Sequence, residues 1–165
     1  MNRTLLIVAA VALAAFSSGA HAQTDQSLIG TWKLVSSRTT TVSGNESTAL
    51  YGRHPAGLIT YTREGRMSSI ITADGRKPLS VADRIAAPPE ERAEAFATLI
   101  AYAGRYTVSG DKVTHHIEVS SFQNWVNTDQ SRSLAFEGSR VTFRTGPLML
   151  GGKLQIAEVV WERLK

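Results

Sequence analysis

Residues 105–121 read RYTVSGDKVTHHIEVSS, and this stretch indicates the fold of the whole chain. Two runs rich in β-branched residues, 105–109 and 112–121, flank the pair Gly110-Asp111. Short runs of this kind, separated by two turn-forming residues, are typical of a β-hairpin with antiparallel strands. The sequence therefore predicts a hairpin here, and similar patterns recur on both sides of it.

Further strands are predicted before and after this hairpin. The turns Arg63-Glu64-Gly65-Arg66 and Gly138-Ser139 each contain glycine and lie between two runs of strand-forming residues. The additional predicted strands are residues 30–39, 57–62, 67–72, 131–137, 140–145 and 153–163. The chain is thus predicted to contain about eight antiparallel strands.

One helix is predicted to interrupt the strands. The run Pro88-Pro89-Glu90-Glu91 is typical of a helix start, because proline fits the first turn and acidic side chains are favoured there. Gly104 is predicted to end the helix. Apolar residues at helical spacing are Phe96, Leu99, Ile100 and Ala103. We expect this apolar stripe to cover the open end or the side of the sheet.

An antiparallel sheet of this size must protect its edges, and closure into a barrel removes them. The predicted fold is therefore mostly β: a single antiparallel β-barrel of about eight strands with one α-helix inserted mid-chain. Residues 23–165 are predicted to form this one domain. A barrel of about eight strands is either packed with side chains or holds one small molecule.

Residues 1–22 are predicted to be a signal peptide. Arg3 precedes the apolar run 5–16, and Ala20-His21-Ala22 is typical of a cleavage site before Gln23. The apolar run is too short to span a membrane, and the absence of cysteine argues against a lipid anchor. We expect an exported protein, periplasmic or secreted, without a membrane anchor.

Charge and motif content argue against several kinds of partner. The formal net charge of the whole chain is only +4, and the arginines are scattered singly, so no nucleic acid partner is predicted. The sequence has no phosphate-binding loop or dinucleotide fingerprint, and no cofactor is predicted.

The string GTWKLVSS at 30–37 resembles the first strand of the calycin barrels. Together with YTREGRMS, AYAGRYTV, VTHHIEVSSFQNWVNTDQSR and VVWERL, it resembles the lipocalin-like domain family over nearly all of residues 23–165. Fatty-acid-binding proteins fit less well, because they place a helix pair directly after the first strand. The resemblance implies a calycin-type β-barrel with Trp32 at its closed base. It also implies that Arg163 covers Trp32 as a cation over an aromatic face, so both residues are structural.

The adjacent residues His115 and His116 must face opposite sides of their strand. They cannot both coordinate one metal ion, and no metal site is predicted. If the apolar face of the strand is interior, His115 lies in the lumen, as a polar residue bonded to a neighbour or as a donor or acceptor for a ligand. The opposite parity would place His116 and Glu118 inside, as a histidine-carboxylate pair able to act as a general base.

Two loops are candidates for the rim of the barrel. Trp125 lies in a polar loop, and it either plugs one end of the barrel or gates a pocket mouth. The segment Tyr51-Gly52-Arg53-His54-Pro55 resembles a rim segment of the family. Arg53 and His54 are either solvated or meet an acidic group of a ligand.

The first functional hypothesis is an exported carrier that binds a small, mostly apolar molecule in the barrel lumen. The predicted ligand contacts are Tyr61, Tyr102, His115 and Trp125. The alternative is an isomerase, cyclase or hydrolase that uses a lumen histidine as general acid or base. A third possibility is a filled barrel that acts as an inhibitor or interaction module, without a cavity.

Overall fold

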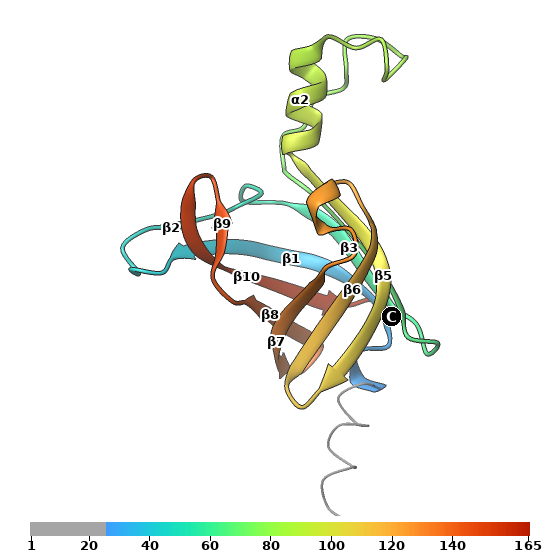
Figure 1. The fold of residues 1–165 in the computed structure, drawn as a ribbon, viewed down its shortest axis with the longest axis vertical. Helices are drawn as coiled ribbons and strands as arrows, with labels where there is room; N and C mark the ends of the chain where they lie inside the picture. The colour runs from blue at the N-terminus through green and yellow to red at the C-terminus, as the bar shows by residue number, and fades with distance from the viewer. Residues whose placement is uncertain (1–25) are drawn as a thin grey trace, which may run out of the picture.

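The computed structural model describes residues 26–165. The predicted signal peptide, residues 1–22, lies outside these described residues. The described chain enters through a short helical turn at 26–28, and nearly all of the remainder consists of strands and tight turns (Figure 1).

Eight long strands form a closed antiparallel barrel, as the sequence predicts. Their order around the barrel is β1, β3, β4, β5, β6, β7, β8 and β10, and β10 pairs with β1 to close the cylinder. Two short strands, β2 and β9, extend the sheet beside β1 and β10. The bounds are β1 Gly30–Thr41, β2 Ser47–Thr48, β3 Ala56–Tyr61, β4 Arg66–Thr72, β5 Leu99–Ser109, β6 Lys112–Ser120, β7 Asp129–Glu137, β8 Arg140–Thr145, β9 Leu148–Leu150 and β10 Lys153–Arg163.

A bulge in β1 changes which residues face the interior. The register of β1 against β10 shifts between Leu34 and Ser36. Trp32 and Leu34 are buried, but the next buried positions are Ser37 and Thr39 rather than Ser36. An extra residue in one strand reverses the alternation beyond it. This bulge brings the Ser37 side chain to the inner wall.

The predicted helix is shorter than its sequence pattern suggests. Helix α2 is Pro89–Ala97, and β5 begins at Leu99. Ile100 and Ala103 therefore belong to a strand, where they pair with residues of β4. The prediction that the helix continues to Gly104 was wrong, because residues 100, 102, 104 and 106 also alternate inward at strand spacing. Pairing with β4 satisfies the backbone of this segment and places Tyr102 in the buried interior.

Helix α2 does not cover the barrel. None of its residues is buried, and Phe96 is 50% exposed. In Figure 1 the helix stands beyond one end of the barrel, continuous with the start of β5. The expected apolar contact was therefore wrong, because three of the four residues of the predicted stripe are in β5.

Gly104 marks a close approach of two strands rather than a helix end. The register between β5 and β6 shifts between Ala103 and Gly104. A Cβ atom at Gly104 would lie 2.0 Å from the carbonyl oxygen of His116. Only glycine therefore fits here without a shift of the backbone.

One end of the barrel is sealed around Trp32. The Arg163 guanidinium lies 4.1 Å from the centre of the Trp32 ring, as a cation over an aromatic face. Arg163 Nη1 donates to the carbonyl of Ile29 at 2.6 Å, and Nη2 donates to the carbonyl of Ser27. Trp32 Nε1 donates to the carbonyl of Leu28 at 2.8 Å. These contacts hold the segment before β1 across the base of the barrel.

Side chains fill the interior next to this base. Tyr61 lies 4.9 Å from Tyr106 and 5.6 Å from His115, measured between ring centres. The buried core cluster also contains Leu28, Leu34, Ile59, Met67, Ile71, Tyr102, Val113, Ile117, Leu134, Val141, Phe143 and Trp161. The hollow part of the lumen begins above this packed layer.

The base contact is a testable source of stability. Arg163→Met should lower the free energy of unfolding by about 2–3 kcal/mol, because it removes the cation from Trp32 and two charge-assisted hydrogen bonds. Arg163→Lys keeps the positive charge but not the planar guanidinium with its paired N–H donors. It should lower the free energy of unfolding by roughly half as much. Urea denaturation followed by circular dichroism measures both changes.

Arg144→Met is the matched control for this prediction. Arg144 lies on the outer wall, and its 3.1 Å pair with Glu158 is solvent-exposed. Its replacement should change the free energy of unfolding by less than about 1 kcal/mol. Equal losses in the Arg163 and Arg144 variants would contradict the sealing role of Arg163.

Candidate functional site

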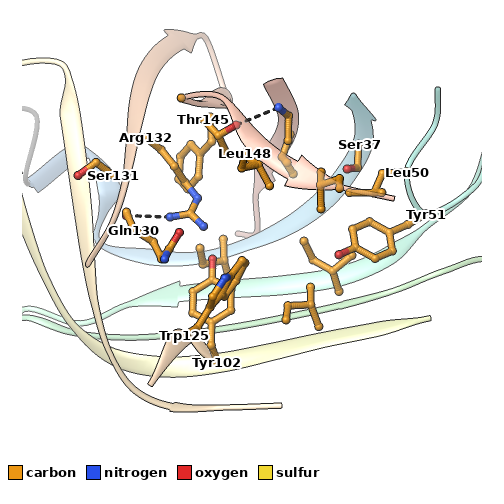
Figure 2. A pocket seen from close by; sticks show the side chains of 18 of the residues that line it. Ser37, Leu50, Tyr51, Tyr102, Trp125, Gln130, Ser131, Arg132, Thr145 and Leu148 are labelled. Atoms are coloured by element: carbon orange, nitrogen blue, oxygen red, sulfur yellow. Dashed lines mark hydrogen bonds between the residues drawn. The ribbon is translucent and has the colours of Figure 1, made fainter. Parts of the chain in front are cut away.

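A pocket of about 190 Å³ opens at the end of the lumen away from Trp32. Its wall is mostly apolar, with a few polar side chains among aliphatic and aromatic ones (Figure 2). The lining residues are Ser37, Leu50, Tyr51, Ile59, Ile71, Ile100, Tyr102, Trp125, Gln130, Ser131, Arg132, Phe143, Thr145, Gly146, Pro147, Leu148, Leu150, Ala157, Val159 and Trp161. A concave apolar site with a few polar groups is typical of small-molecule binding.

Trp125 and Tyr102 form an aromatic wall of the pocket. Their ring centres are 5.5 Å apart in an edge-to-face arrangement, and Phe122 lies 6.1 Å from Trp125. Trp125 belongs to the short 3₁₀ helix η1, Gln123–Trp125, between β6 and β7. Asn127, in the left-handed region at φ 61°, turns the chain back and donates its backbone N–H to Ile117 at 2.8 Å. The loop therefore presents Trp125 in a defined position.

Tyr51 contributes to the rim from the loop between β2 and β3. Burial, and secondarily Tyr102, raise the pKa of the Tyr51 hydroxyl to about 12, so it stays protonated at neutral pH. Asp74 Oδ2 fixes the following backbone by accepting the N–H groups of Arg53 at 2.8 Å and His54 at 3.0 Å. The Arg53 and His54 side chains are exposed and do not line the pocket.

Arg132 brings a positive charge to the pocket wall. On β7, Gln130, Arg132 and Leu134 share the inward face, and Arg132 pairs with Val113 of β6. Arg132 Nη1 donates to the carbonyl of Gln130 at 2.8 Å. Figure 2 shows the guanidinium extending into the pocket, above Tyr102 and Trp125. Within the described chain, Arg132 is the one lining residue with a charged side chain.

His115 is fully buried at the floor of this site, just outside the pocket lining. Its Nδ1 lies 3.3 Å from Arg132 Nη1 and 3.4 Å from the Tyr102 hydroxyl, and its Nε2 lies 2.6 Å from the Tyr61 hydroxyl. Arginine can only donate, so Nδ1 accepts and the ring proton of neutral His115 lies on Nε2, directed at Tyr61. Both ring nitrogens are thus engaged.

The surroundings of His115 favour its neutral form. Burial holds the pKa of His115 well below its usual value, and the charge of Arg132 lowers it further. Burial likewise holds the pKa of Tyr61 well above 10. His115 is buried beneath the pocket lining, and both of its ring nitrogens already form hydrogen bonds to protein groups. This arrangement gives no support to acid-base catalysis by His115.

The opposite parity, with His116 and Glu118 inside the lumen, was wrong. His116 lies on the outer wall, where Nδ1 is 2.7 Å from Asp129 Oδ1 and Nε2 is 3.0 Å from Thr107 Oγ1. Glu118 is also outside and forms a salt bridge of 2.6 Å with Arg66. The apolar residues Val113 and Ile117 on the same strand are buried, and their burial decides the parity.

The structure separates the four predicted ligand contacts into two layers. Tyr102 and Trp125 line the pocket. Tyr61 and His115 lie beneath it in the packed layer and do not line it. Direct ligand contact by any of the four stays a prediction.

The polar lining residues Arg132 and Ser37 were not predicted from the sequence, and neither were Gln130, Ser131 and Thr145. Arg132 shares strand parity with Leu134, and this spacing was the available signal for an inward-facing arginine. Ser37 faces inward only because of the bulge in β1, which no residue pattern indicates. In residues 26–165 the hydroxyl of Ser37 and the indole nitrogen of Trp161 are buried without a hydrogen-bond partner, although both residues line the pocket.

Comparison with known proteins places this barrel in a family. The model of the lipocalin-like domain matches residues 29–164, which is most of the chain. The chain belongs to the lipocalin-like domain family. A 4'-hydroxy-3'-methoxypropiophenone carrier protein of Aspergillus oryzae is 34% identical to it over 84 residues, which cover 46% of this chain and 76% of that protein. In residues 26–165, no helix is long and apolar enough to cross a membrane.

The buried neutral His115 of this lipocalin-like barrel predicts a loss of stability in acid. The unfolded chain takes up a proton at His115 below about pH 6.5, whereas the folded chain does so only at much lower pH. Protons therefore favour unfolding, and the free energy of unfolding should fall by up to about 1.4 kcal/mol per pH unit between about pH 6 and pH 5 from this group. His115→Gln should remove that component of the slope in urea denaturation.

His54→Gln is the control, because His54 is exposed on a loop. This variant should keep the pH slope of the parent protein. If the slopes of the His115→Gln variant and the parent coincide, His115 is not held neutral in the folded state.

Proposed function

We propose that this protein is an exported carrier that binds a small, mostly apolar molecule in the pocket at the open end of the barrel. The observation that carries the proposal is a preformed cavity, about 190 Å³, lined by Tyr102, Trp125, Phe143 and aliphatic side chains. Such a cavity removes apolar ligand surface from water without reorganising the protein. A filled barrel acting only as an interaction module would have no such space.

The size of the cavity restricts the ligand. It is smaller than the roughly 300–1,000 Å³ of pockets for drug-sized ligands, and somewhat larger than an apolar cavity of about 150 Å³ that admits benzene. A compound with one ring and short substituents fits within this space, whereas a long acyl chain would extend beyond it. The rings of Tyr102 and Trp125 offer both edge and face contacts to an aromatic ligand.

The relative from Aspergillus oryzae supports the same class of ligand. It is named as the carrier of a hydroxy-methoxy aromatic ketone, which is a single-ring compound. We propose compounds of this size as ligands of the present chain, and the named ketone is a suitable first probe.

Binding is tested by titrating the purified protein with 4'-hydroxy-3'-methoxypropiophenone while tryptophan fluorescence is recorded. Ala157 is buried at the pocket wall, so Ala157→Leu places three more carbon atoms in the cavity. We expect saturable quenching by the parent protein and at least about tenfold weaker binding by Ala157→Leu, because the ligand and the new side chain compete for the same volume.

Ala135→Leu is the matched control, because Ala135 is exposed on β7 and lies outside the pocket lining. It should bind like the parent protein. Absence of binding by the parent to any single-ring compound at millimolar concentration, together with an empty extract from the freshly purified protein, would refute the carrier proposal.

Export is a separate part of the proposal. It is supported by the sequence of residues 1–22, with Arg3, the apolar run 5–16 and Ala20-His21-Ala22. Expression of the full chain in a Gram-negative host should yield protein in the periplasm or medium that begins at Gln23 by N-terminal sequencing. Ala22→Arg should block cleavage and leave a larger, cell-associated form. Full-length protein in the cytoplasm of cells expressing the parent would contradict export.

A further inference from the structure

The charge of Arg132 has no counterion in the described structure. None of the ion pairs formed by residues 26–165 includes Arg132, and every residue that lines the pocket with it is neutral. The neighbours of its guanidinium are the Gln130 carbonyl, His115 Nδ1 and the Tyr102 ring, whose centre is 5.7 Å away. A guanidinium partly withdrawn from water is stabilised far more by an anion than by neutral acceptors.

The hydrogen-bonding capacity of Arg132 is also only partly used. Both of its hydrogen bonds within the described residues come from Nη1, so Nη2 and Nε keep free N–H groups. Guanidinium groups bind carboxylates through two parallel N–H groups, and the pocket lies on the side toward which Arg132 extends (Figure 2).

The floor of the pocket holds this arginine in place. Tyr61 and His115 are both buried, and the 2.6 Å contact between them orients the imidazole. That orientation presents Nδ1 to Arg132 as an acceptor, while the Gln130 carbonyl fixes the same Nη1. The guanidinium is therefore preorganised before a ligand arrives, which lowers the entropic cost of binding.

From these contacts we infer that the ligand carries a carboxylate, which pairs with Arg132 while its single-ring apolar body lies against Tyr102 and Trp125. The inference rests on the proposed carrier function and specifies its ligand class: a small aromatic acid rather than a neutral aromatic compound. Arg132 is the group that distinguishes the two, because the remaining lining residues are uncharged.

The test compares two ligands of nearly the same shape, 4-hydroxy-3-methoxybenzoate and 4'-hydroxy-3'-methoxyacetophenone, which differ only by a carboxylate in place of an acetyl group. Isothermal titration calorimetry at about pH 7, where the acid is ionised, gives both dissociation constants. The parent protein should bind the acid at least about tenfold more tightly than the ketone. This comparison requires no variant.

Variants then assign the preference to Arg132. Arg132→Gln should weaken binding of the acid by about tenfold or more and change binding of the ketone by less than about threefold. Arg132→Lys keeps the charge and should restore part of the preference. Arg144→Gln, on the exposed outer wall, is the control and should behave as the parent protein.

Each outcome separates this inference from the carrier function. If the parent binds the ketone as tightly as the acid or more tightly, the carrier function stands and the carboxylate inference is overturned. If the acid is preferred but the preference survives in Arg132→Gln, the assignment to Arg132 is overturned. If neither compound nor any other single-ring compound binds, the carrier function fails and the inference fails with it.

Discussion

The pairing of β1 with β10 is the constraint on which the other features depend. It runs from Trp32 opposite Arg163 to Thr41 opposite Gln155, and it converts a sheet with two open edges into a cylinder. Only in the closed form do residues of β5, β7 and β10 face one another across a common interior. The same pairing brings Arg163 over Trp32, so closure of the sheet and sealing of the base are produced by one set of contacts.

The closed interior is divided into a packed layer and a hollow one, and the first positions the second. Tyr61, His115 and Arg132 form a hydrogen-bonded series that begins in the packed layer and ends at the pocket wall. A charged imidazole could not accept a hydrogen bond from a guanidinium, so the neutral state of His115 is a requirement of this series. Burial of His115 therefore shapes the pocket indirectly: it keeps the imidazole neutral, and the neutral imidazole accepts the hydrogen bond that positions Arg132.

Much of the barrel could be predicted from the sequence, because glycine turns and short alternating runs mark the eight barrel strands, whereas the short strands β2 and β9 were not predicted. Residues 99–103 misled the prediction, since their apolar positions satisfy helical and strand spacing together and only pairing with β4 decides between them. The inward position of His115 followed from strand alternation once the apolar face was taken as interior. The unpaired charge of Arg132 did not, because its lack of a counterion among residues 26–165 depends on spatial neighbours from distant strands. The inward position of Ser37 could not be predicted, because the bulge in β1 shifts the alternation of inward and outward side chains and no residue pattern marks it.

The mouth and the sealed base lie at opposite ends of the barrel, and this separation has an evolutionary consequence. The mouth includes loop and turn residues such as Tyr51, Trp125 and Pro147, whereas the base is built from Trp32, Arg163 and the segment before β1. Mutations at the mouth can therefore accumulate without loss of the folded state. Under the proposed carrier function, rim substitutions would change which ligand is bound while the base keeps the barrel folded, so directed evolution of binding should begin at those positions.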